Sequence, residues 1–442
     1  MKIYNPTVSY TSVSVNLLQQ LNARGGYPAG TDAPKSQSLP GLKFAPSAAA
    51  SAIMRILMGS EGVTASANST GNSLRMEIER YTHGENDHIT QVRAAGSGDV
   101  DLAVVSSRKE SISVVTAGGN DIIQVVGNRV SGVSGERGND HIQIVGLASK
   151  KLDDHTVGFV SGDDGNDTIA IASRGEVDVV EGGDGNDAIA ITAQGDVDRV
   201  SGGDGNDAIA ISTAGYVLRL EGGDGNDAIA IAAGRDVNLI DGGDGRDTIA
   251  VSAKGSVSML DGGDGDDVIS ISADDTSLID GGDGNDTISV TAKWQAFASG
   301  GDGNDVLSLS GREVRAGGGD GNDTLQLSGH DLMAVGGTGN DRIKLDSTSG
   351  QVATLRMAEG DGNDVVESNT SLNIARYSSD GTARLDPANA TLAHNDDGTV
   401  TVSFEGSSDS VTVKFTGAMA GHEIGMRIEN GNLVVGPANG QS

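Results

Sequence analysis

Residues 182–191 read Gly-Gly-Asp-Gly-Asn-Asp-Ala-Ile-Ala-Ile, and the first six residues of this stretch return along the chain. Eleven copies or near-copies begin at Gly162, Gly182, Gly202, Gly222, Gly242, Gly262, Gly281, Gly300, Gly318, Gly336 and Glu359. Successive copies are 20 residues apart five times, then 19 twice, 18 twice and 23 once. A fixed period of this length predicts a solenoid, in which each repeat forms one coil that stacks on the next.

A strand is predicted after each copy, because large aliphatic residues alternate there with small ones. The expected inward column is Ile169, Ile189, Ile209, Ile229, Ile249, Ile269, Ile288, Leu307, Leu325 and Ile343, with a second column two residues later. The second half of each repeat alternates less cleanly. Only the columns headed by Val177 and Val180 stay apolar there, so the sequence leaves the register of the second strand open.

The six-residue turn has the chemistry of a calcium site. Its three glycines allow left-handed backbone conformations that expose carbonyl oxygens, and it closes with an aspartate. Carbonyl and carboxylate oxygens without Cys or His favour Ca²⁺, and because the ion takes six to eight oxygens, two stacked turns must share it. The candidate metal ligands are Asp167, Asp187, Asp207, Asp227, Asp247, Asp267, Asp286, Asp305, Asp323, Asp341 and Asp364.

The pattern Gly-Gly-x-Gly-x-Asp-x-(large aliphatic)-x resembles the nonapeptide of the RTX (repeats-in-toxin) proteins, closely over residues 162–367 and more weakly over 84–161. The resemblance implies an all-β, right-handed parallel β-roll or β-helix that binds calcium. In that family both turns of a coil hold calcium, but here the opposite turn (Arg174-Gly175-Glu176) lacks the motif. We therefore expect coils of 18–20 residues with up to about ten Ca²⁺ ions on one side, similar to the one-sided solenoids of some RTX adhesins.

Composition supports a metal-dependent, acidic protein. The 442 residues include 67 Gly, 62 Asp plus Glu, 30 Lys plus Arg and no Cys, and the net charge is −32. This charge argues against nucleic acid and anionic membranes as partners. One Ca²⁺ in each of the ten gaps between eleven turns would bring the net charge to about −12. The regular repeats are thus expected to fold on binding calcium.

Outside the regular repeats the sequence predicts caps and degenerate coils. Near-copies at Gly84, Gly118 and Arg137 keep Asn-Asp but lose glycines, which predicts coils with impaired or missing metal sites. The chain is predicted to begin with a flexible segment and Pro-rich linker (1–46). An N-terminal cap (47–80) follows, with a helix at 47–58 and a strand at 74–78. After it come degenerate coils (81–161), the regular solenoid (162–367) and a C-terminal β-rich cap (368–442).

The expected location is extracellular, where calcium reaches millimolar concentrations. Residues 1–22 contain no apolar run typical of a cleaved signal peptide, and no stretch reaches membrane-spanning length. Two export routes stay open. The C-terminal tail fits type I secretion, and the first 60 residues resemble the N-termini of type III secreted effectors of host-associated bacteria.

The sequence favours a non-enzymatic binding, adhesion or virulence-associated protein. It contains neither a His-Glu-x-x-His zinc motif nor a Gly-x-Ser-x-Gly elbow. A polysaccharide lyase or epimerase on a β-helix is the enzymatic alternative, but it needs a basic groove for uronates, whereas the outward residues are mostly Asp, Ala, Ser and Thr. The flat Ala/Ser/Thr face is a candidate surface for a glycan or a host-cell component.

Overall fold

The computed structural model describes residues 63–69, 75–83, 87–95, 98–106, 111–147, 156–379, 381, 383–429 and 431–438. The predicted flexible segment and linker (1–46) and the predicted helix (47–58) lie outside these residues. The chain divides into two units, Met1–Asp184 with Ala190–Gly195, and Gly185–Ile189 with Asp196–Ser442. Together their described residues are nearly all β-strand and form about 14 turns of a parallel β-solenoid, which confirms the predicted fold class.

The first unit stacks parallel strands in two layers. One layer pairs β3, β5, β7, β9 and β11, and the other pairs β4, β6, β8 and β10. The strands are β1 (Val63–Ser69), β2 (Arg75–His83), β3 (Asp87–Ala95), β4 (Val100–Ser106), β5 (Ser111–Val115), β6 (Ile122–Gly127), β7 (Arg129–Ser134), β8 (His141–Gly146), β9 (Val157–Asp164), β10 (Thr168–Ser173) and β11 (Val177–Asp184). Strand β12 (Ala188–Ala193) runs across the division between the units.

The start of the first unit differs from the prediction of a degenerate coil at Gly84. Strand β2 pairs antiparallel with β3, from Arg75 opposite Ala95 to His83 opposite Asp87, so these strands form a hairpin. Strand β1 likewise pairs antiparallel with β4. Parallel coils begin where β3 pairs with β5. Asn-Asp without the glycine frame is therefore not sufficient to specify a coil.

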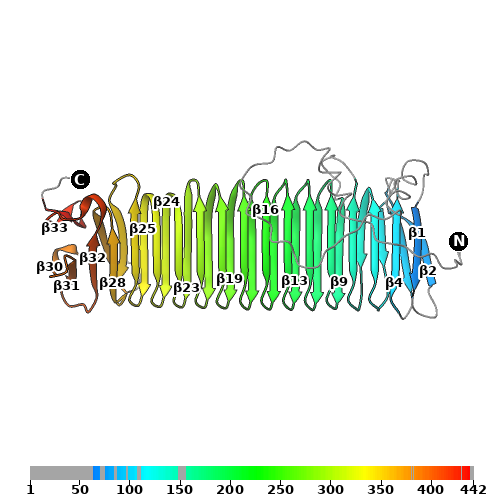
Figure 1. Ribbon diagram of the computed structural model, residues 1–442, viewed down its shortest axis with the longest axis horizontal. Coiled ribbons are helices and arrows are strands. Elements are labelled where there is room, and N and C mark those ends of the chain that lie inside the picture. The colour runs from blue at the N-terminus through cyan, green and yellow to red at the C-terminus, as the bar shows by residue number, and fades with distance from the viewer. Residues whose placement is uncertain are drawn as a thin grey trace. The chain divides into compact units, whose positions relative to one another are not determined.

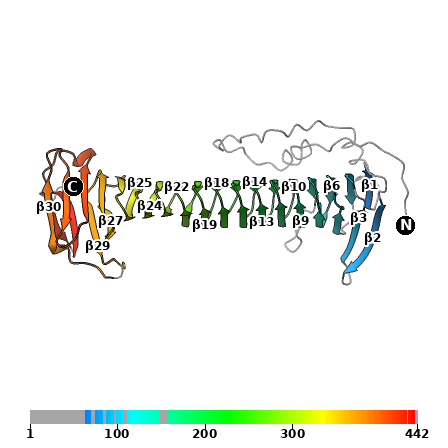
Figure 2. The same ribbon diagram turned by 90° about the horizontal axis from the view of Figure 1, so that it is seen from below.

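The second unit continues the same architecture in two layers, one of odd-numbered strands from β13 to β23 and one of even-numbered strands from β14 to β22 (Figures 1 and 2). These strands are β13 (Val197–Asp204), β14 (Ala208–Thr213), β15 (Val217–Asp224), β16 (Ala228–Ala233), β17 (Val237–Asp244), β18 (Thr248–Ala253), β19 (Ser256–Asp264), β20 (Val268–Ala273), β21 (Asp275–Asp283), β22 (Thr287–Ala292) and β23 (Gln295–Asp302). The 15-residue strands β24 (Val306–Asp320) and β25 (Thr324–Thr338) each run through both layers, and β26 (Arg342–Ser347), β27 (Ala353–Ala358), β28 (Asn363–Ser368) and β29 (Leu372–Tyr377) follow.

The predicted aliphatic column is the core of both units. All ten residues of the column, from Ile169 to Ile343, are at most 2% exposed. In the second unit Ile209, Ile229 and Ile249 are in register on neighbouring strands, 20 residues apart. The interval shortens to 19 between Ile269 and Ile288 and to 18 between Leu307 and Leu325. Each coil therefore buries its aliphatic residues against those of the coils on either side.

An extra residue in each coil explains why the second strand does not alternate cleanly. Val237 and Ile240 are both buried although they are three residues apart, and the paired strands β15 and β19 keep the same three-residue interval. In β23 the buried residues Ala296 and Ala298 are two apart, and the strand alternates normally. Loss of this extra residue is one source of the shortening from 20 to 18 residues per coil.

The C-terminal residues form the predicted β-rich cap on the last coil of the second unit. Strand β32 (Ser410–Phe415) pairs parallel with β28, and β34 (Asn432–Pro437) pairs antiparallel with β29. Strands β30 (Ala390–His394), β31 (Val400–Phe404) and β33 (Ile424–Glu429) complete the cap, with 3₁₀ turns η1 (Pro387–Asn389) and η2 (Gly417–Met419). The hairpin predicted at Asn430-Gly431 joins β33 and β34. Within the described residues, no helix is long and apolar enough to cross a membrane.

Candidate functional site

The repeated turn needs glycine at two positions. Gly223 has a φ of 119° and Gly225 a φ of 127°, in the left-handed region that side chains disfavour. Stacking adds a second constraint, since a Cβ on Gly223 would lie 2.0 Å from the carbonyl oxygen of Gly203, and one on Gly225 would lie 2.1 Å from that of Gly205. The glycines thus allow successive turns to stack at strand spacing and hold the closing aspartates in register.

The closing aspartates form a hydrogen-bonded ladder that follows the stack. The N–H of Asp207 donates to Oδ1 of Asp227 at 2.7 Å, and the N–H of Asp227 donates to Oδ1 of Asp247 at 2.7 Å. In the second unit this carboxylate ladder joins Asp187, Asp207, Asp227, Asp247, Asp267, Asp286, Asp305, Asp323, Asp341 and Asp364. Ten of the eleven predicted ligands are therefore brought together in one row, and each is at most 2% exposed.

The first unit contains a shorter ladder of the same kind. The N–H of Asp121 donates to Oδ1 of Asp140, and the N–H of Asp140 donates to Oδ1 of Asp167, the eleventh predicted ligand. Asp121 and Asp140 were absent from the predicted ligands because their turns lack part of the glycine frame. The signal that identifies them is a glycine directly before the retained Asn-Asp, Gly119 and Gly138, whereas the near-copy at Gly84 has Glu85 there.

In ten of the ladder residues, the second carboxylate oxygen is buried without a hydrogen bond. This holds for Oδ2 of Asp121, Asp140, Asp207, Asp227, Asp247, Asp267, Asp286, Asp305, Asp323 and Asp341. A buried acceptor without a donor is costly, and an ionised one more so. Each of these oxygens therefore needs a proton or a cation that protein hydrogen bonds do not supply.

A backbone oxygen lies close to each of these carboxylates. The point where a Cβ on Gly222 would stand is 2.4 Å from Oδ2 of Asp227 and 2.3 Å from the carbonyl oxygen of Gly242. The same pairing of a carboxylate oxygen with a glycine carbonyl oxygen recurs at Gly202, Gly242, Gly262, Gly281, Gly300 and Gly318. The two oxygens of each pair are thus at most about 5 Å apart, and a positive charge or a shared proton beside them would stabilise both. The donor set of carboxylate and carbonyl oxygens fits Ca²⁺.

The pKa values of the ladder carboxyls reflect the same lack of compensation. Burial raises the pKa of Asp227 and of Asp247 to about 6, and of Asp286 and Asp341 to about 7, and neighbouring ladder carboxylates add to the rise. In the first unit, burial raises the pKa of Asp140 to about 8. A cation beside these oxygens would stabilise their ionised form, and protons would compete for the same oxygens.

An asparagine ladder that the sequence analysis missed runs beside the carboxylates in the opposite direction. The N–H of Asn206 donates to Oδ1 of Asn186 at 2.7 Å, and the N–H of Asn226 donates to Oδ1 of Asn206 at 2.9 Å. The side-chain amides extend the ladder, since Nδ2 of Asn226 also donates to Oδ1 of Asn206. The signal was the Asn at the fifth position of nearly every copy. These residues stabilise the turn itself, because they pair with one another.

The first aspartate of the motif is placed differently from the closing one. Asp204, Asp224 and Asp244 are aligned on neighbouring strands, as expected, but are exposed. Arg246, which replaces Asn at the fifth position of its copy, is the cation next to this row. Its Nε lies 3.8 Å from Oδ2 of Asp266, and both side chains are exposed, so the pair contributes little stability. Across the described part of the chain, no three His, Cys, Asp or Glu side chains converge into a metal-binding group. A bound Ca²⁺ would therefore take most of its ligands from carbonyls and water.

The geometry at the first glycine predicts a stability loss for Gly222→Ala. The backbone conformation of Gly222 is not left-handed, so the cost comes only from the Cβ meeting Oδ2 of Asp227 and the carbonyl of Gly242. We expect unfolding to become easier by about 1–3 kcal/mol, measured by thermal or urea denaturation. Gly317→Ala is the matched control, since its Cβ would lie 3.7 Å from the nearest atom. Equal midpoints for the two variants would contradict the close packing inferred here.

The fold and the site together define a parallel β-solenoid with a one-sided ladder of buried, incompletely paired carboxylates. No known family model and no curated protein matches this chain.

Proposed function

We propose that the chain is a calcium-binding β-solenoid of the RTX type, a secreted protein whose regular repeats fold when they bind Ca²⁺ outside the cell. The observation that carries the proposal is the recurring pair of a buried Oδ2 and a glycine carbonyl oxygen, as at Asp227 and Gly242. A divalent cation that prefers hard oxygen ligands would neutralise this pair at every coil. The glycine-rich motif that resembles the RTX nonapeptide supports the same ion.

The bound ion would act through the carboxylate ladder on folding. Asp207, Asp227 and Asp247 would hold it with their second oxygens, while their first oxygens continue to accept N–H groups from the preceding coil. Because the ladder exists only when the coils stack, the free energy of binding adds to the free energy of folding. Low intracellular calcium would keep the repeats unfolded for export by the type I or type III route.

We further propose that the protein is non-enzymatic and serves binding, adhesion or virulence at a cell surface. The support is the distribution of its perturbed carboxyls: raised pKa values recur coil after coil, at Asp227, Asp286 and Asp341, whereas catalytic groups gather at one place. A polysaccharide lyase or epimerase remains the enzymatic alternative. Turnover of a uronate polymer by the calcium-loaded protein would overturn the non-enzymatic assignment.

The test of the proposed function is circular dichroism of the full chain during a titration from chelator into millimolar Ca²⁺. We expect a cooperative gain of β signal with Ca²⁺ and a much smaller gain with Mg²⁺, whose small octahedral shell suits this site poorly. Asp207→Ala with Asp227→Ala should shift the transition to higher Ca²⁺ concentration. Calorimetry should find several ions per chain and at most about ten. A spectrum already folded in chelator, with no heat of Ca²⁺ binding, would refute the proposal.

A further inference from the structure

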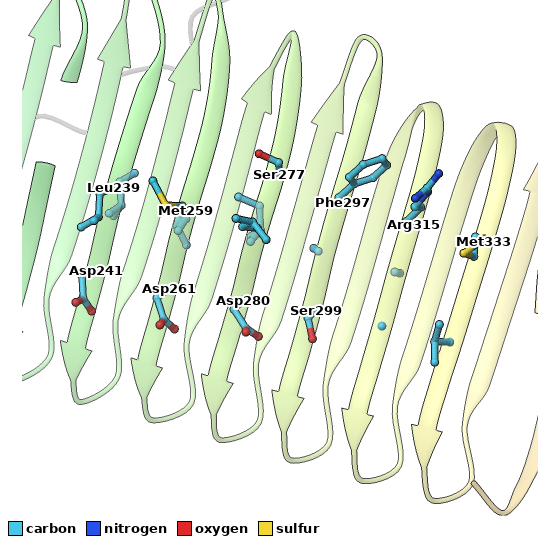
Figure 3. Close-up of a pocket in the computed structure, with 18 residues that line it drawn as sticks. Leu239, Asp241, Met259, Asp261, Ser277, Asp280, Phe297, Ser299, Arg315 and Met333 are labelled. Atoms are coloured by element: carbon cyan, nitrogen blue, oxygen red, sulfur yellow. The ribbon is translucent and has the colours of Figure 1, made fainter. Parts of the chain in front are cut away.

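A second surface of the second unit lies on the outer face of β17, β19, β21, β23, β24 and β25. It is an open groove of 670 Å³, which we call the apolar groove. Its floor is a row of side chains, one from each strand: Leu239, Met259, Leu278, Phe297, Arg315 and Met333. Figure 3 labels five residues of this row, all except Leu278, next to a second row that contains Asp241, Asp261 and Asp280. The carboxylate ladder does not line the groove.

The floor exposes large apolar side chains on strained backbone. Leu278 is 72% exposed and Met259 is 48% exposed. Both residues adopt left-handed conformations, with φ of 53° and 56°, which are unusual for bulky side chains. They occupy the position of the extra residue in their coils. Ser258 pairs with Ser277 and Leu260 with Ile279, while Met259 and Leu278 are left out of the register. Glycine would adopt this conformation at lower cost, so folding alone does not account for Met and Leu here.

One wall of the groove carries concentrated negative charge. Asp241, Asp261 and Asp280 are in register on neighbouring strands, about 4.8 Å apart. Among the described residues, none of the three forms an ion pair. Arg219 favours the charged form of Asp241, and Ser299 and the backbone at Gly281 and Gly282 hydrogen-bond to Asp280, so the row is partly compensated. Apolar surface beside this row of carboxylates is complementary to a partner that has both apolar and cationic side chains.

The geometry restricts the form of that partner. A strand cannot add to the sheet at the groove, because β19 and β21 are paired on both edges. A second copy of this chain would bring a net charge of −32 against the acidic wall. Six strands at about 4.8 Å spacing give a groove about 24 Å long. An α-helix of about 16 residues has this length.

We propose that the apolar groove binds a cationic amphipathic α-helix of another protein. Its apolar stripe lies on Leu239, Met259 and Leu278, and its Lys or Arg side chains face Asp241, Asp261 and Asp280. This binding is separate from the carboxylate ladder and does not depend on whether calcium drives folding, provided that the protein is tested in its folded state.

The experiment measures fluorescence anisotropy of labelled 16-residue peptides with the full chain in calcium-containing buffer. The first peptide is an amphipathic Leu/Lys helix, the second replaces each Lys by Glu, and the third keeps every Lys but replaces each Leu by Ser. The proposal requires that the Leu/Lys peptide binds at least about ten-fold more tightly than either of the others. Equal binding of the Leu/Lys and Ser/Lys peptides would mean that charge attraction alone explains the binding and that the apolar stripe contributes nothing, which would overturn the proposal.

Leu278→Gly is the decisive protein variant. It removes the exposed side chain and relieves the left-handed strain, so the variant should fold at least as stably as the parent chain while its peptide affinity falls about ten-fold. Val268→Ser, which alters an exposed apolar side chain on β20 in the other layer, is the control and should bind within about two-fold of the parent. Unchanged affinity for Leu278→Gly would overturn the proposal.

Discussion

Asp227→Asn combined with Asp247→Asn is expected to raise the thermal midpoint of the protein in chelator and to lower it in calcium. At pH 7 without metal, where the regular repeats should still show an unfolding transition, both carboxyls are mostly ionised although burial raises their pKa to about 6, which costs about 3 kcal/mol for each. Asparagine removes the charge, keeps an Oδ1 for the N–H of Asp207, and places an amide that can donate to the carbonyl of Gly242. We expect a rise of about 5 °C or more in chelator.

In calcium the same substitutions should act in the opposite direction. Asparagine is a weaker ligand than a carboxylate, so each variant site loses the stabilisation by bound ion, about 3 kcal/mol when the free ion is at a hundred times its dissociation constant. The control is Asp224→Asn combined with Asp244→Asn, which changes the charge equally at the exposed first position of the motif and should shift neither midpoint by more than about 1–2 °C. A midpoint that moves in the same direction with and without calcium would contradict a metal-binding ladder.

The repeat could be predicted from sequence because one residue type carries each structural role. Ile229 and its equivalents supply the core, Gly223 and Gly225 permit the turn, and the fixed period places them on neighbouring strands. The position of the extra residue at Met259 and Leu278 could not be predicted. Two apolar residues stand next to each other in each strand, Met259-Leu260 and Leu278-Ile279, and the sequence does not show which of the two is excluded from the register.

The candidate ligands could also be predicted, but their hydrogen bonds could not. Chemistry alone identified Asp227 as an oxygen donor, yet the direction of the ladder, N–H of Asp207 to Oδ1 of Asp227, depends on how adjacent coils are staggered. The asparagine ladder runs the other way for the same reason. A single repeat contains no information on stagger, because it arises only when two coils stack.

The stability of the metal-free protein is expected to fall as the pH rises from about 4 to about 8. Burial raises the pKa of Asp305 to about 6 and of Asp364 to about 7, alongside Asp227, Asp286 and Asp341. These folded-state pKa values exceed the ordinary value of 3.8. At any pH between 3.8 and the raised pKa, the folded chain therefore binds more protons than the unfolded chain. The stabilisation is complete below pH 4 and is lost as the pH passes through 6 to 7.

The loss of unfolding free energy caused by this rise in pH exceeds the loss caused by any single core substitution. Each shift of two to three pKa units costs about 3–4 kcal/mol once the carboxyl is ionised, and several such groups together match the whole stability of a typical domain, about 5–15 kcal/mol. Urea denaturation in chelator at a series of pH values measures it. The regular repeats should be folded near pH 5 and largely unfolded near pH 8.

Calcium should reverse the sign of this pH dependence. A bound divalent ion stabilises the ionised carboxylates, so binding releases protons from the ladder and strengthens as the pH rises. At saturating Ca²⁺ the urea midpoint should therefore stay level or rise between pH 5 and pH 8, while it falls in chelator. If instead the midpoint fell equally in both buffers, protons rather than calcium would be the only charge that compensates Oδ2 of Asp227 and its equivalents, and the ladder would be a purely structural device.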